Sequence, residues 1–560
     1  MHIHWRRCVC LLVGLGVITT CRAAAPRHRW VYLSTNLQVA DNVGVAEGIL
    51  RRAKAAGYNG VVLSDYKLNR LDSVPPQYFD NARTFAKTAA ALGFDVYPAV
   101  CPIGYSNGLL SHDPNLAEGL PVKDATFVVS GREADVVSTN LLSNGGFEAV
   151  HGDKLDDWTM QDAPGVVSFS DSSEHHGGAR SIRMTNIGAG DPQAGHGRLM
   201  RTVPVKPFRQ YHVSVWIKTK DYDSPGETRC TVLTAAGAEL TFPGWSIAPT
   251  QDWTEYHAVF NSLANTSVNV YFGVWGGKHG SIWWDDARVE EVGFLNVLRR
   301  QGCPLTVKGE DGTPYSEGSD FDVVKDERMG TVPWPGEYEV YHTPPHLRLL
   351  RGSRIKDGQM LKVSFYHAVT IYGGQVCSCL SDPKVYTLLA DQIRRVNDLF
   401  HPKGFLMSHD ELRVANWCET CLKRKLTPGE LLADNVKRCA AMIRKASPKA
   451  ELYVWSDMFD PYHNARDKYY LVNGALLGSW RGLDKGVGYV NWNFDARAKN
   501  AAWINKRGNK QILAGYYDGK PESIKTWLND IRGVSGVDGV MYTTWQNRYD
   551  DLEAFAKAAW

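Results

Sequence analysis

The 560-residue sequence lacks long apolar runs, a strong net charge and several familiar enzyme motifs. After the first thirty or so residues no stretch approaches the roughly eighteen apolar residues of a transmembrane helix, so no membrane span is expected. The 63 basic and 60 acidic residues nearly cancel, and no basic stripe is interleaved with aromatic rings, so no nucleic-acid partner is expected. The absence of a phosphate loop, a dinucleotide fingerprint and a serine-centred nucleophile elbow argues against nucleotide and esterase chemistry.

Aromatic residues, in contrast, are abundant. The chain has 18 Trp and 25 Tyr, which is more than packing alone requires. Flat amphipathic rings line sugar-binding clefts, although large cores also take them up. With 44% hydrophobic and 22% charged residues, the composition is that of a globular chain, and its length predicts three or four domain-sized units, or fewer if one of them is a barrel.

Residues 1–24 have the features of a signal peptide. Two arginines precede an apolar run over residues 8–20, and three alanines follow it. A run of about thirteen apolar residues is too short to span a bilayer. The protein is therefore expected to be exported, to the periplasm or the extracellular space. Residues 18–21 also faintly resemble a lipobox, which would place a lipid anchor on Cys21.

Short β-rich runs alternate with helical patterns in two separate parts of the chain. The first part predicts three strands and the second predicts five more in the same alternation, which is typical of a parallel sheet. Three and five make eight, the strand count of a (β/α)8 TIM barrel in the α/β class. The expected strands comprise residues 30–34, 61–64, 94–97, 405–407, 452–455, 489–492, 511–515 and 540–545.

A segment with a different sequence pattern separates these two parts, so the barrel is expected to be interrupted after its third strand. Period-two alternation and turns predominate in this segment, which predicts an inserted all-β jelly-roll or sandwich. Residues 361–366 are a ninth strand candidate and are assigned to a connecting segment. The predicted organisation is a signal peptide over 1–24, a first barrel part over 25–137, the sandwich over 138–293, a connecting or rim segment over 294–380 and a second barrel part over 381–560.

The C-terminal ends of the expected strands are rich in acids and aromatic residues, and in a TIM barrel the catalytic groups lie at these ends. Asp410 and Glu411 follow the fourth strand. Two nearby carboxyl groups raise the pKa of one of them, which suits a general acid. Both side chains enter the site only if the chain turns after the strand, because successive residues of a strand face opposite sides. The alternative interpretation is one surface acid beside one rim acid.

Four motifs at these strand ends resemble the glycoside hydrolase family 20 β-N-acetylhexosaminidases. They are Ser408-His409-Asp410-Glu411, Trp455-Ser456-Asp457, Tyr516-Tyr517-Asp518 and Thr544-Trp545. The likeness covers only the two barrel parts. Residues 407–409 are Met, Ser and His where the family usually has glycines just before its Asp-Glu pair, so we expect a distant relative.

This resemblance implies a substrate-assisted retaining mechanism, in which the sugar's own 2-acetamido oxygen attacks the anomeric carbon. Glu411 would be the general acid/base, Asp410 would orient the acetamido nitrogen, and no cofactor would be needed for catalysis. The substrate contacts that it implies are Tyr516 or Tyr517 at the acetamido oxygen, Trp455, Trp480 and Trp545 around the sugar, and Asp457 or Asp518 at the hydroxyls. Trp492 at the end of the sixth expected strand and His409 after the fourth are further candidates for substrate contact.

Two alternatives to this function stay open. In the first, Glu411 is the acid/base of an ordinary retaining glycosidase, and Asp457 or Asp518 is its covalent nucleophile. In the second, the chain is a non-catalytic glycan-binding surface protein whose barrel and sandwich only bind. A glycan or glycoconjugate is the partner in every case.

The inserted segment has a likeness of its own. Residues 144–148, Asn-Gly-Gly-Phe-Glu, and residues 283–286, Trp-Trp-Asp-Asp, resemble the opening and closing strands of carbohydrate-binding modules of families 4 and 9. The resemblance implies that Glu148 and Asp286 help to hold a structural calcium ion, which prefers oxygen ligands. Whether the module binds sugar or only shapes the cleft is left open.

Eight cysteines follow the expected signal peptide, at positions 101, 230, 303, 377, 379, 418, 421 and 439. Export to an oxidising compartment favours disulfides, and free buried thiols are a second interpretation. The third interpretation is a structural zinc ion held by Cys377, Cys379, Cys418 and Cys421.

Overall fold

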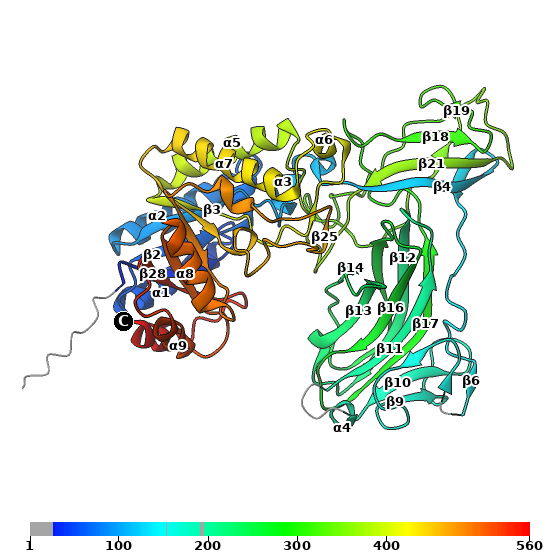
Figure 1. Cartoon of the computed structure of the whole chain (residues 1–560), viewed down its shortest axis with the longest axis horizontal. Helices are drawn as coiled ribbons and strands as arrows, with labels where there is room; N and C mark the ends of the chain where they lie inside the picture. The colour runs from blue at the N-terminus through cyan, green and yellow to red at the C-terminus, as the bar shows by residue number, and fades with distance from the viewer. Residues whose placement is uncertain (1–25, 153, 191–194) are drawn as a thin grey trace, which may run out of the picture.

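The computed structural model describes residues 26–152, 154–190 and 195–560, and its main body is a closed barrel of eight parallel strands (Figure 1). Each of the eight expected strands overlaps one of them, so the predicted fold class is confirmed. The expected signal peptide and Cys21 lie outside the described residues. The barrel strands in order are β1 (His28–Ser34), β2 (Gly60–Ser64), β3 (Asp95–Val100), β22 (Gly404–Met407), β24 (Glu451–Trp455), β26 (Val487–Asn491), β27 (Gln511–Tyr516) and β28 (Val537–Thr543).

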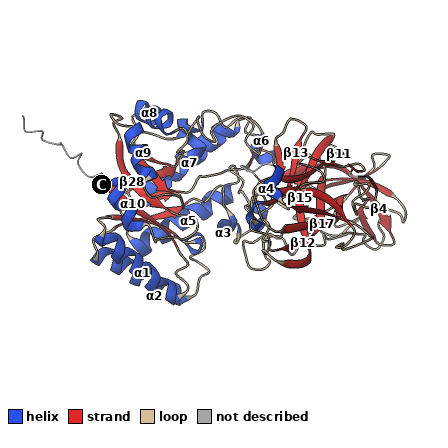
Figure 2. Cartoon of the chain, turned by 90° about the horizontal axis from the view of Figure 1, so that it is seen from below, coloured by secondary structure: helices blue, strands red, loops and turns tan. Residues whose placement is uncertain are grey.

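Helices between these strands cover the outside of the barrel (Figure 2). In the part of the chain that the structure describes, no helix combines the length and apolarity needed to cross a membrane. Thr427 caps α7 through a capping box with Glu430, which fixes where that helix begins. The covering helices are α1 (Ala40–Ala55), α2 (Pro76–Ala91), α5 (Pro383–Phe400), α7 (Pro428–Ala446), α8 (Arg497–Arg507), α9 (Ser523–Asp530) and α10 (Leu552–Ala559).

Large aromatic side chains fill the interior of the barrel near the N-terminal ends of its strands. Trp30, Tyr97 and Tyr453 form one cluster, with ring centroids 4.2 Å and 4.8 Å from Trp30. Gly60 on β2 makes this packing possible, because a Cβ there would lie 2.4 Å from the Trp30 ring. The interior is therefore a packed core, and the open end is left for the residues that follow the strands.

The inserted segment folds into two packed five-stranded sheets, as the all-β prediction requires. Its interior is rich in β-branched and aromatic residues such as Phe272 and Trp284, whose centroids are 5.7 Å apart. One sheet has the order β15 (Gln251–Asn261), β12 (Gln210–Lys220), β17 (Ser281–Glu291), β10 (Ser181–Thr185) and β9 (Ser168–Asp171). The other has the order β14 (Glu239–Thr241), β13 (Thr228–Thr234), β16 (Ser267–Val274), β11 (Gly197–Pro204) and β8 (Thr159–Met160).

A third sheet occupies much of the expected connecting segment, together with residues 120–136, which had been assigned to the barrel. It has six antiparallel strands and a core of its own that includes Phe127, Phe294 and Phe365. The ninth strand candidate lies in its strand β21. The sheet order is β19 (Pro314–Tyr315), β18 (Thr306–Gly309), β21 (Met360–His367), β4 (Leu120–Ser130), β5 (Glu133–Val136) and β20 (Leu347–Arg348). Figure 1 shows it beside the sandwich, at the far end of β4 from the barrel.

Candidate active site

The Asp410-Glu411 pair lies in the turn that follows β22. The strand ends at Met407, and Glu411 adopts a left-handed backbone conformation with φ of 50°. The chain thus turns as required for both carboxyl groups to be near the barrel mouth, and both remain partly exposed. Gly104, in the loop after β3, permits the turn to pack closely, because a Cβ there would lie 1.9 Å from the Asp410 carbonyl oxygen. Strained backbone of this kind concentrates at functional sites.

The Glu411 carboxylate is held by two partners. It accepts a hydrogen bond from the Tyr105 hydroxyl, and Oε2 lies 2.8 Å from Nη2 of Arg413. Arg413 is buried, and its guanidinium group lies over the rings of Tyr372 and Tyr470, at 4.4 Å and 5.1 Å from their centroids. A buried cation with these contacts fixes the position of Glu411 far better than a surface ion pair does.

Asp457 supports the turn from the end of β24. Its Oδ2 accepts hydrogen bonds from the Glu411 backbone N–H at 2.9 Å and from Nδ2 of Asn464 at 3.0 Å. Its Oδ1 accepts one from Nε1 of Trp492 at 3.3 Å. The side chain is completely buried, and burial raises the pKa of Asp457 to about 6 although these donors lower it.

Asp410 carries the strongly perturbed carboxyl group of the pair. Burial raises its pKa well above the ordinary range, and the nearby charges of Asp457 and Glu411 raise it further. Three neighbouring acids with perturbed or fixed carboxyl groups at the open end of a barrel are the kind of arrangement that general acid and base chemistry uses.

Five aromatic rings stand beside these acids at the barrel mouth, and we call them the aromatic wall. Trp545 has ring centroids 5.2 Å from Tyr32, 5.7 Å from Trp455 and 5.7 Å from Tyr517. Tyr517 in turn stacks on Trp492 at 5.6 Å with an interplanar angle of 7°. Tyr517 and Trp545 are 40% and 45% exposed, so their faces are open to a ligand. A pocket of about 290 Å³ adjoins Trp492 and Tyr517.

His409 and Trp480, both predicted at the substrate, pack against the helix layer. His409 is buried and its Nε2 lies 2.9 Å from Oδ1 of Asn435 on α7, so it faces the helix layer. Trp480 packs against Trp503 of α8, with their centroids 5.4 Å apart. His409 faces outward because the strand has already ended at Met407, and alternation no longer sets side-chain direction.

The Tyr516-Tyr517-Asp518 motif sends its three side chains in different directions, because all three residues have φ between 56° and 70°. Only Tyr517 belongs to the aromatic wall. Tyr516 is buried, stacks on Tyr542 and donates to Asp551 at 3.0 Å. Asp518 accepts the Trp545 backbone N–H at 2.7 Å and the Thr544 hydroxyl at 2.5 Å, so it positions the loop that carries Trp545.

Tyr105, Tyr32 and Arg413 are site residues that the sequence analysis did not assign to the site. Tyr105 follows the third strand by five residues and stands next to the close-packing Gly104. The position of Tyr32 inside the first strand carried no signal, because residues 30–33 are all apolar or aromatic and are equally typical of a barrel core. For Arg413 the sequence did offer one indication, since it lies two residues after Glu411 of the acid pair.

The sandwich reaches the rim of this site. The Phe242 ring stacks on Tyr372 at 5.2 Å, and the Phe242 carbonyl accepts the Tyr372 N–H at 2.9 Å. Glu239 of β14 accepts a hydrogen bond from Tyr470, so two residues of the insert contact the rings that flank Arg413. A pocket of about 200 Å³ opens on the same sheet and is lined by Gln161, Arg198, Arg229, Thr231, Leu233, Glu239, Phe242, Tyr271 and Trp275.

The predicted calcium residues lie together at the opposite part of the sandwich. Oε1 of Glu148 accepts the N–H groups of Ala179 and Arg180 at 2.8 Å and 3.2 Å. Oδ2 of Asp286 lies 2.7 Å from Nδ1 of His176. Both carboxylates thus face the turn over residues 176–180.

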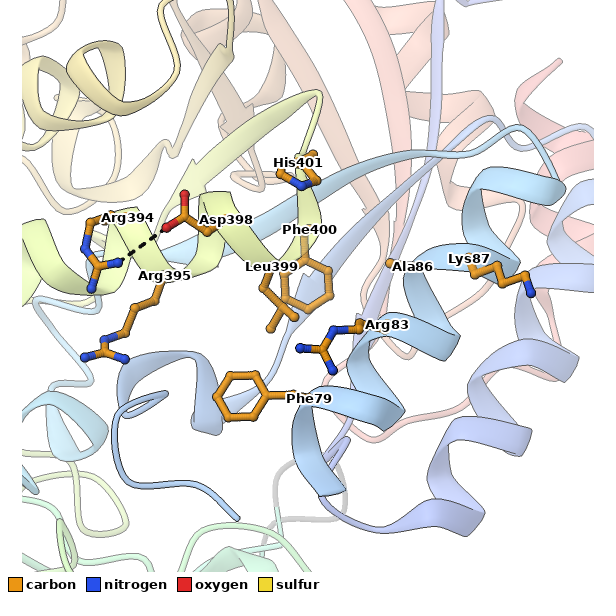
Figure 3. A pocket seen from close by; sticks show the side chains of 10 residues that line it. All are labelled: Phe79, Arg83, Ala86, Lys87, Arg394, Arg395, Asp398, Leu399, Phe400 and His401. Carbon is orange, nitrogen blue, oxygen red and sulfur yellow. Dashed lines mark hydrogen bonds and ion pairs between the residues drawn. The ribbon is translucent and has the colours of Figure 1, made fainter. Parts of the chain in front are cut away.

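Another groove, of about 600 Å³, lies on the outer helix layer between α2 and α5 (Figure 3). Arg83 and Lys87 line one side of it, and Arg394 and Arg395 line the other. It contains neither the paired acids nor the aromatic wall. The residues in it therefore serve as controls for the site at the barrel mouth.

Comparisons with known proteins bear mainly on the sandwich. Residues 139–286 match a family model described as a carbohydrate binding domain. Curated proteins gave no match. Among solved structures, the xylan-binding CBM22-1 domain from Paenibacillus barcinonensis is 15% identical with a TM-score of 0.21, and the match covers 28% of this chain and 96% of that domain.

Two glycosidase structures match over a longer range. A chitobiase from Flavobacterium johnsoniae is 10% identical with a TM-score of 0.37, and the match covers 96% of this chain and 48% of that one. A rhamnosidase from Novosphingobium sp. PP1Y is 11% identical with a TM-score of 0.34, covering 96% and 58%. This chain therefore spans about half the length of the chitobiase. The carbohydrate binding domain match supports a carbohydrate-active protein.

Proposed function

We propose that the protein is a glycoside hydrolase that cleaves β-linked N-acetylhexosaminides by a substrate-assisted retaining mechanism. The observation that carries this proposal is the Asp410-Glu411 pair at the end of a barrel strand, beside an aromatic wall that can stack on a sugar. The carbohydrate binding domain match supports a glycan as the substrate. We further propose that the protein is exported, as the first 24 residues indicate.

Glu411 acts as the general acid/base in this proposal. It protonates the glycosidic oxygen as the bond from that oxygen to C1 breaks, while the acetamido carbonyl oxygen bonds to C1. In the second step water attacks C1 and gives a proton to Glu411, while the bond from C1 to the acetamido oxygen breaks. This restores both the free acid and the 2-acetamido group. The contacts from Tyr105 and Arg413 support this role because they hold the carboxylate in one position through both steps.

Asp410 accepts the acetamido N–H while the ring closes. A carboxylate whose pKa is raised, as burial and the neighbouring charges of Asp457 and Glu411 raise that of Asp410, is a strong proton acceptor when ionised. Tyr517 is the candidate donor to the acetamido oxygen, since Tyr516 is buried against Tyr542. Trp492 and Trp545 offer the ring faces on which the sugar can stack, whereas the predicted contact Trp455 is buried and packs against Trp545.

The arrangement favours substrate assistance over an enzymic nucleophile. Asp457 accepts three hydrogen bonds and is fully buried, and both oxygens of Asp518 are engaged by the loop after β28. A nucleophilic carboxylate needs an oxygen directed at the anomeric carbon. The turnover assay described next distinguishes an enzyme from the alternative, a protein that only binds glycans.

The test is release of chromophore from aryl β-N-acetylglucosaminide and β-N-acetylgalactosaminide, alongside aryl β-glucoside and β-galactoside. We expect turnover of the acetamido sugars only, and loss of about 10³-fold in kcat for Asp410→Ala. Glu411→Gln should not turn over substrates with poor leaving groups, because these need protonation of the glycosidic oxygen. Asp398→Asn, in the outer groove, is the matched control. Activity confined to the plain glycosides would contradict substrate assistance, and glycan binding without turnover of any glycoside would leave the binding alternative.

For the sandwich we propose the calcium ion that Glu148 and Asp286 suggest. The two carboxylates would supply oxygen ligands to the ion. Calcium should raise the melting temperature of the wild type but not that of Glu148→Ala.

A further inference from the structure

Four side chains of metal-ligating type meet in the interior where the chain leaves the barrel for the six-stranded sheet. They are Glu118, Cys379, Cys418 and Cys421, all buried, and one donor atom from each lies within 4.8 Å of the others. Glu118 lies two residues before β4, and Cys379 lies four residues before α5. Cys418 and Cys421 belong to the short helix α6 (Glu419–Leu422) and its cap, which both views place between the barrel helices and the β-sheets (Figures 1 and 2).

The spacing of the sulfur atoms distinguishes a metal site from a disulfide. Sγ of Cys379 lies 3.6 Å from Sγ of Cys418 and 3.6 Å from Sγ of Cys421, and all eight described cysteines are free. A disulfide needs about 2.05 Å. Zinc bonds of about 2.3 Å to sulfur place two thiolates of a tetrahedron about 3.8 Å apart. The observed separations fit the edges of that tetrahedron.

Glu118 completes the same polyhedron with an oxygen. Its Oε2 lies 3.5 Å from Sγ of Cys421 and 3.7 Å from Sγ of Cys418. Bonds of about 2.0 Å to oxygen and 2.3 Å to sulfur predict an edge of about 3.5 Å between the two donors. Its other oxygen, Oε1, accepts the N–H groups of Trp417 and Cys418 at 2.9 Å and 2.8 Å. The backbone thus orients the carboxylate so that one oxygen points at the thiols, as outer-shell hydrogen bonds do in metal sites.

The surroundings also supply charge compensation. Arg300 is electrostatically coupled to Glu118, Cys379 and Cys418, and it is fixed by hydrogen bonds to the carbonyl groups of Asn115 and Ala117 at 2.7 Å and 3.0 Å. Three thiolates and a carboxylate around a divalent ion leave two negative charges, and the buried guanidinium of Arg300, which also lies 3.8 Å from Oδ2 of Asp382, offsets part of this charge. Burying these groups in their ionised forms without a cation would be costly.

We propose that Glu118, Cys379, Cys418 and Cys421 bind a structural zinc ion. Soft thiolate ligands select zinc over magnesium and calcium, and four protein donors leave no open position for a reacting water molecule. Cys377, which the sequence grouped with Cys379, is not one of the ligands, since its thiol contacts the Gly104 carbonyl at 3.3 Å. Cys303 touches Cys418 but lies outside the set of mutually close donors.

The zinc ion ties together three segments that are distant in sequence. Glu118 and Cys379 flank the isolated antiparallel bridge between Ala117 and Ser378, where Glu118 N–H donates to the Cys377 carbonyl and Cys379 N–H donates to the Leu116 carbonyl. Cys418 and Cys421 add the loop that follows Glu411. The ion therefore anchors the C-terminal end of the segment that carries Glu411 and Arg413.

The test is the metal content of the full chain, purified without a nickel column or chelator and measured by mass spectrometry. We expect about one zinc ion per chain in the wild type and a loss of about tenfold or more in Cys379→Ser and in the double variant Cys418→Ser/Cys421→Ser. Cys377→Ser is the matched control, because it removes a buried thiol two residues away and should keep the full content. Glu118→Gln should weaken zinc retention during dialysis against a chelator.

Cobalt exchange keeps the proposal testable if the cysteine variants fail to fold. Wild-type protein in which Co²⁺ replaces zinc should show intense thiolate-to-cobalt charge-transfer absorption and the visible bands of a tetrahedral ion. Wild-type protein without bound metal, together with a Cys379 disulfide to Cys418 or Cys421 in peptide mapping, would overturn the proposal. Full zinc retention in Glu118→Gln with loss in Cys303→Ser would overturn Glu118 as the fourth ligand.

Discussion

The backbone N–H of Glu411 donates a hydrogen bond of 2.9 Å to Oδ2 of Asp457, and this contact holds Glu411 in its left-handed conformation. Asp457→Ala removes the acceptor, so the turn should relax and Glu411 should move. A displacement of about 1 Å can cost about 100-fold in rate. We expect such a loss in kcat on the glycoside that the wild type turns over, with KM changed much less. Asp398→Ala should leave kcat unchanged, and an unchanged kcat in Asp457→Ala would refute the positioning role.

Asp457 also makes the stability of the barrel depend on pH. Burial raises its pKa to about 6 from an unfolded value near 3.9, so between these values the folded state binds more protons than the unfolded state. The free energy of unfolding must therefore fall as pH rises through this window. Asp457→Asn cannot titrate. We expect the stability of the wild type relative to this variant to fall by about 2–3 kcal/mol between pH 4 and pH 7, measured by urea denaturation. Parallel stability curves would contradict this assignment.

Arg413 should not be replaceable by lysine. Its guanidinium group pairs with Glu411 at 2.8 Å, donates to Gln375 and lies over Tyr372 and Tyr470. Lysine keeps the charge but has neither the planar fork nor the stacking surface. Arg413→Lys should therefore lower both the melting temperature and kcat, and Arg413→Ala should destabilise the fold by about 1–3 kcal/mol because the partly exposed Glu411 carboxylate loses its charged partner. Thermal denaturation and steady-state kinetics check both expectations.

Two tryptophans of the predicted sugar wall should behave differently. Trp545 is 45% exposed and belongs to the aromatic wall, whereas Trp480 packs on Trp503. Loss of a stacking ring costs about 1–3 kcal/mol of binding, so Trp545→Ala should raise KM by about tenfold or more. Trp480→Ala should lower the melting temperature and leave KM close to that of the wild type. Equal effects on KM would show that the wall is not the sugar platform.

The sandwich pocket should bind polymer independently of turnover. Trp275 lines it, whereas Trp253 lies on the opposite sheet. Trp275→Ala should lose retardation in affinity gels that contain a bound polysaccharide, while its kcat on a small aryl glycoside stays normal. Trp253→Ala should keep both properties. If instead Trp275→Ala binds as the wild type does, the pocket only shapes the cleft.

The strands of the barrel were predictable because each is a short apolar run followed by a helical pattern, and such signals are local. The six-stranded sheet was not, because its strands β4 and β21 pair Phe127 with Leu361, and no local pattern reports a partner so far along the chain. The sequence was sufficient to recognise which strand ends carry paired acids and aromatic residues. The directions in which these side chains point could not be predicted. They depend on left-handed backbone conformations at Glu411 and at residues 516–518, which period-two alternation does not describe.

The interruption of the barrel also bears on how the chain folds. β3 and β22 are neighbours in the closed barrel, with Val100 opposite Met407, yet about 300 residues separate them. Closing a loop of that length while it is still disordered is entropically costly and slow. We therefore expect the sandwich and the six-stranded sheet to form first, which shortens the effective loop, and the two barrel parts to join last. During synthesis β3 would therefore lack its partner β22 until the second part of the barrel has been synthesised.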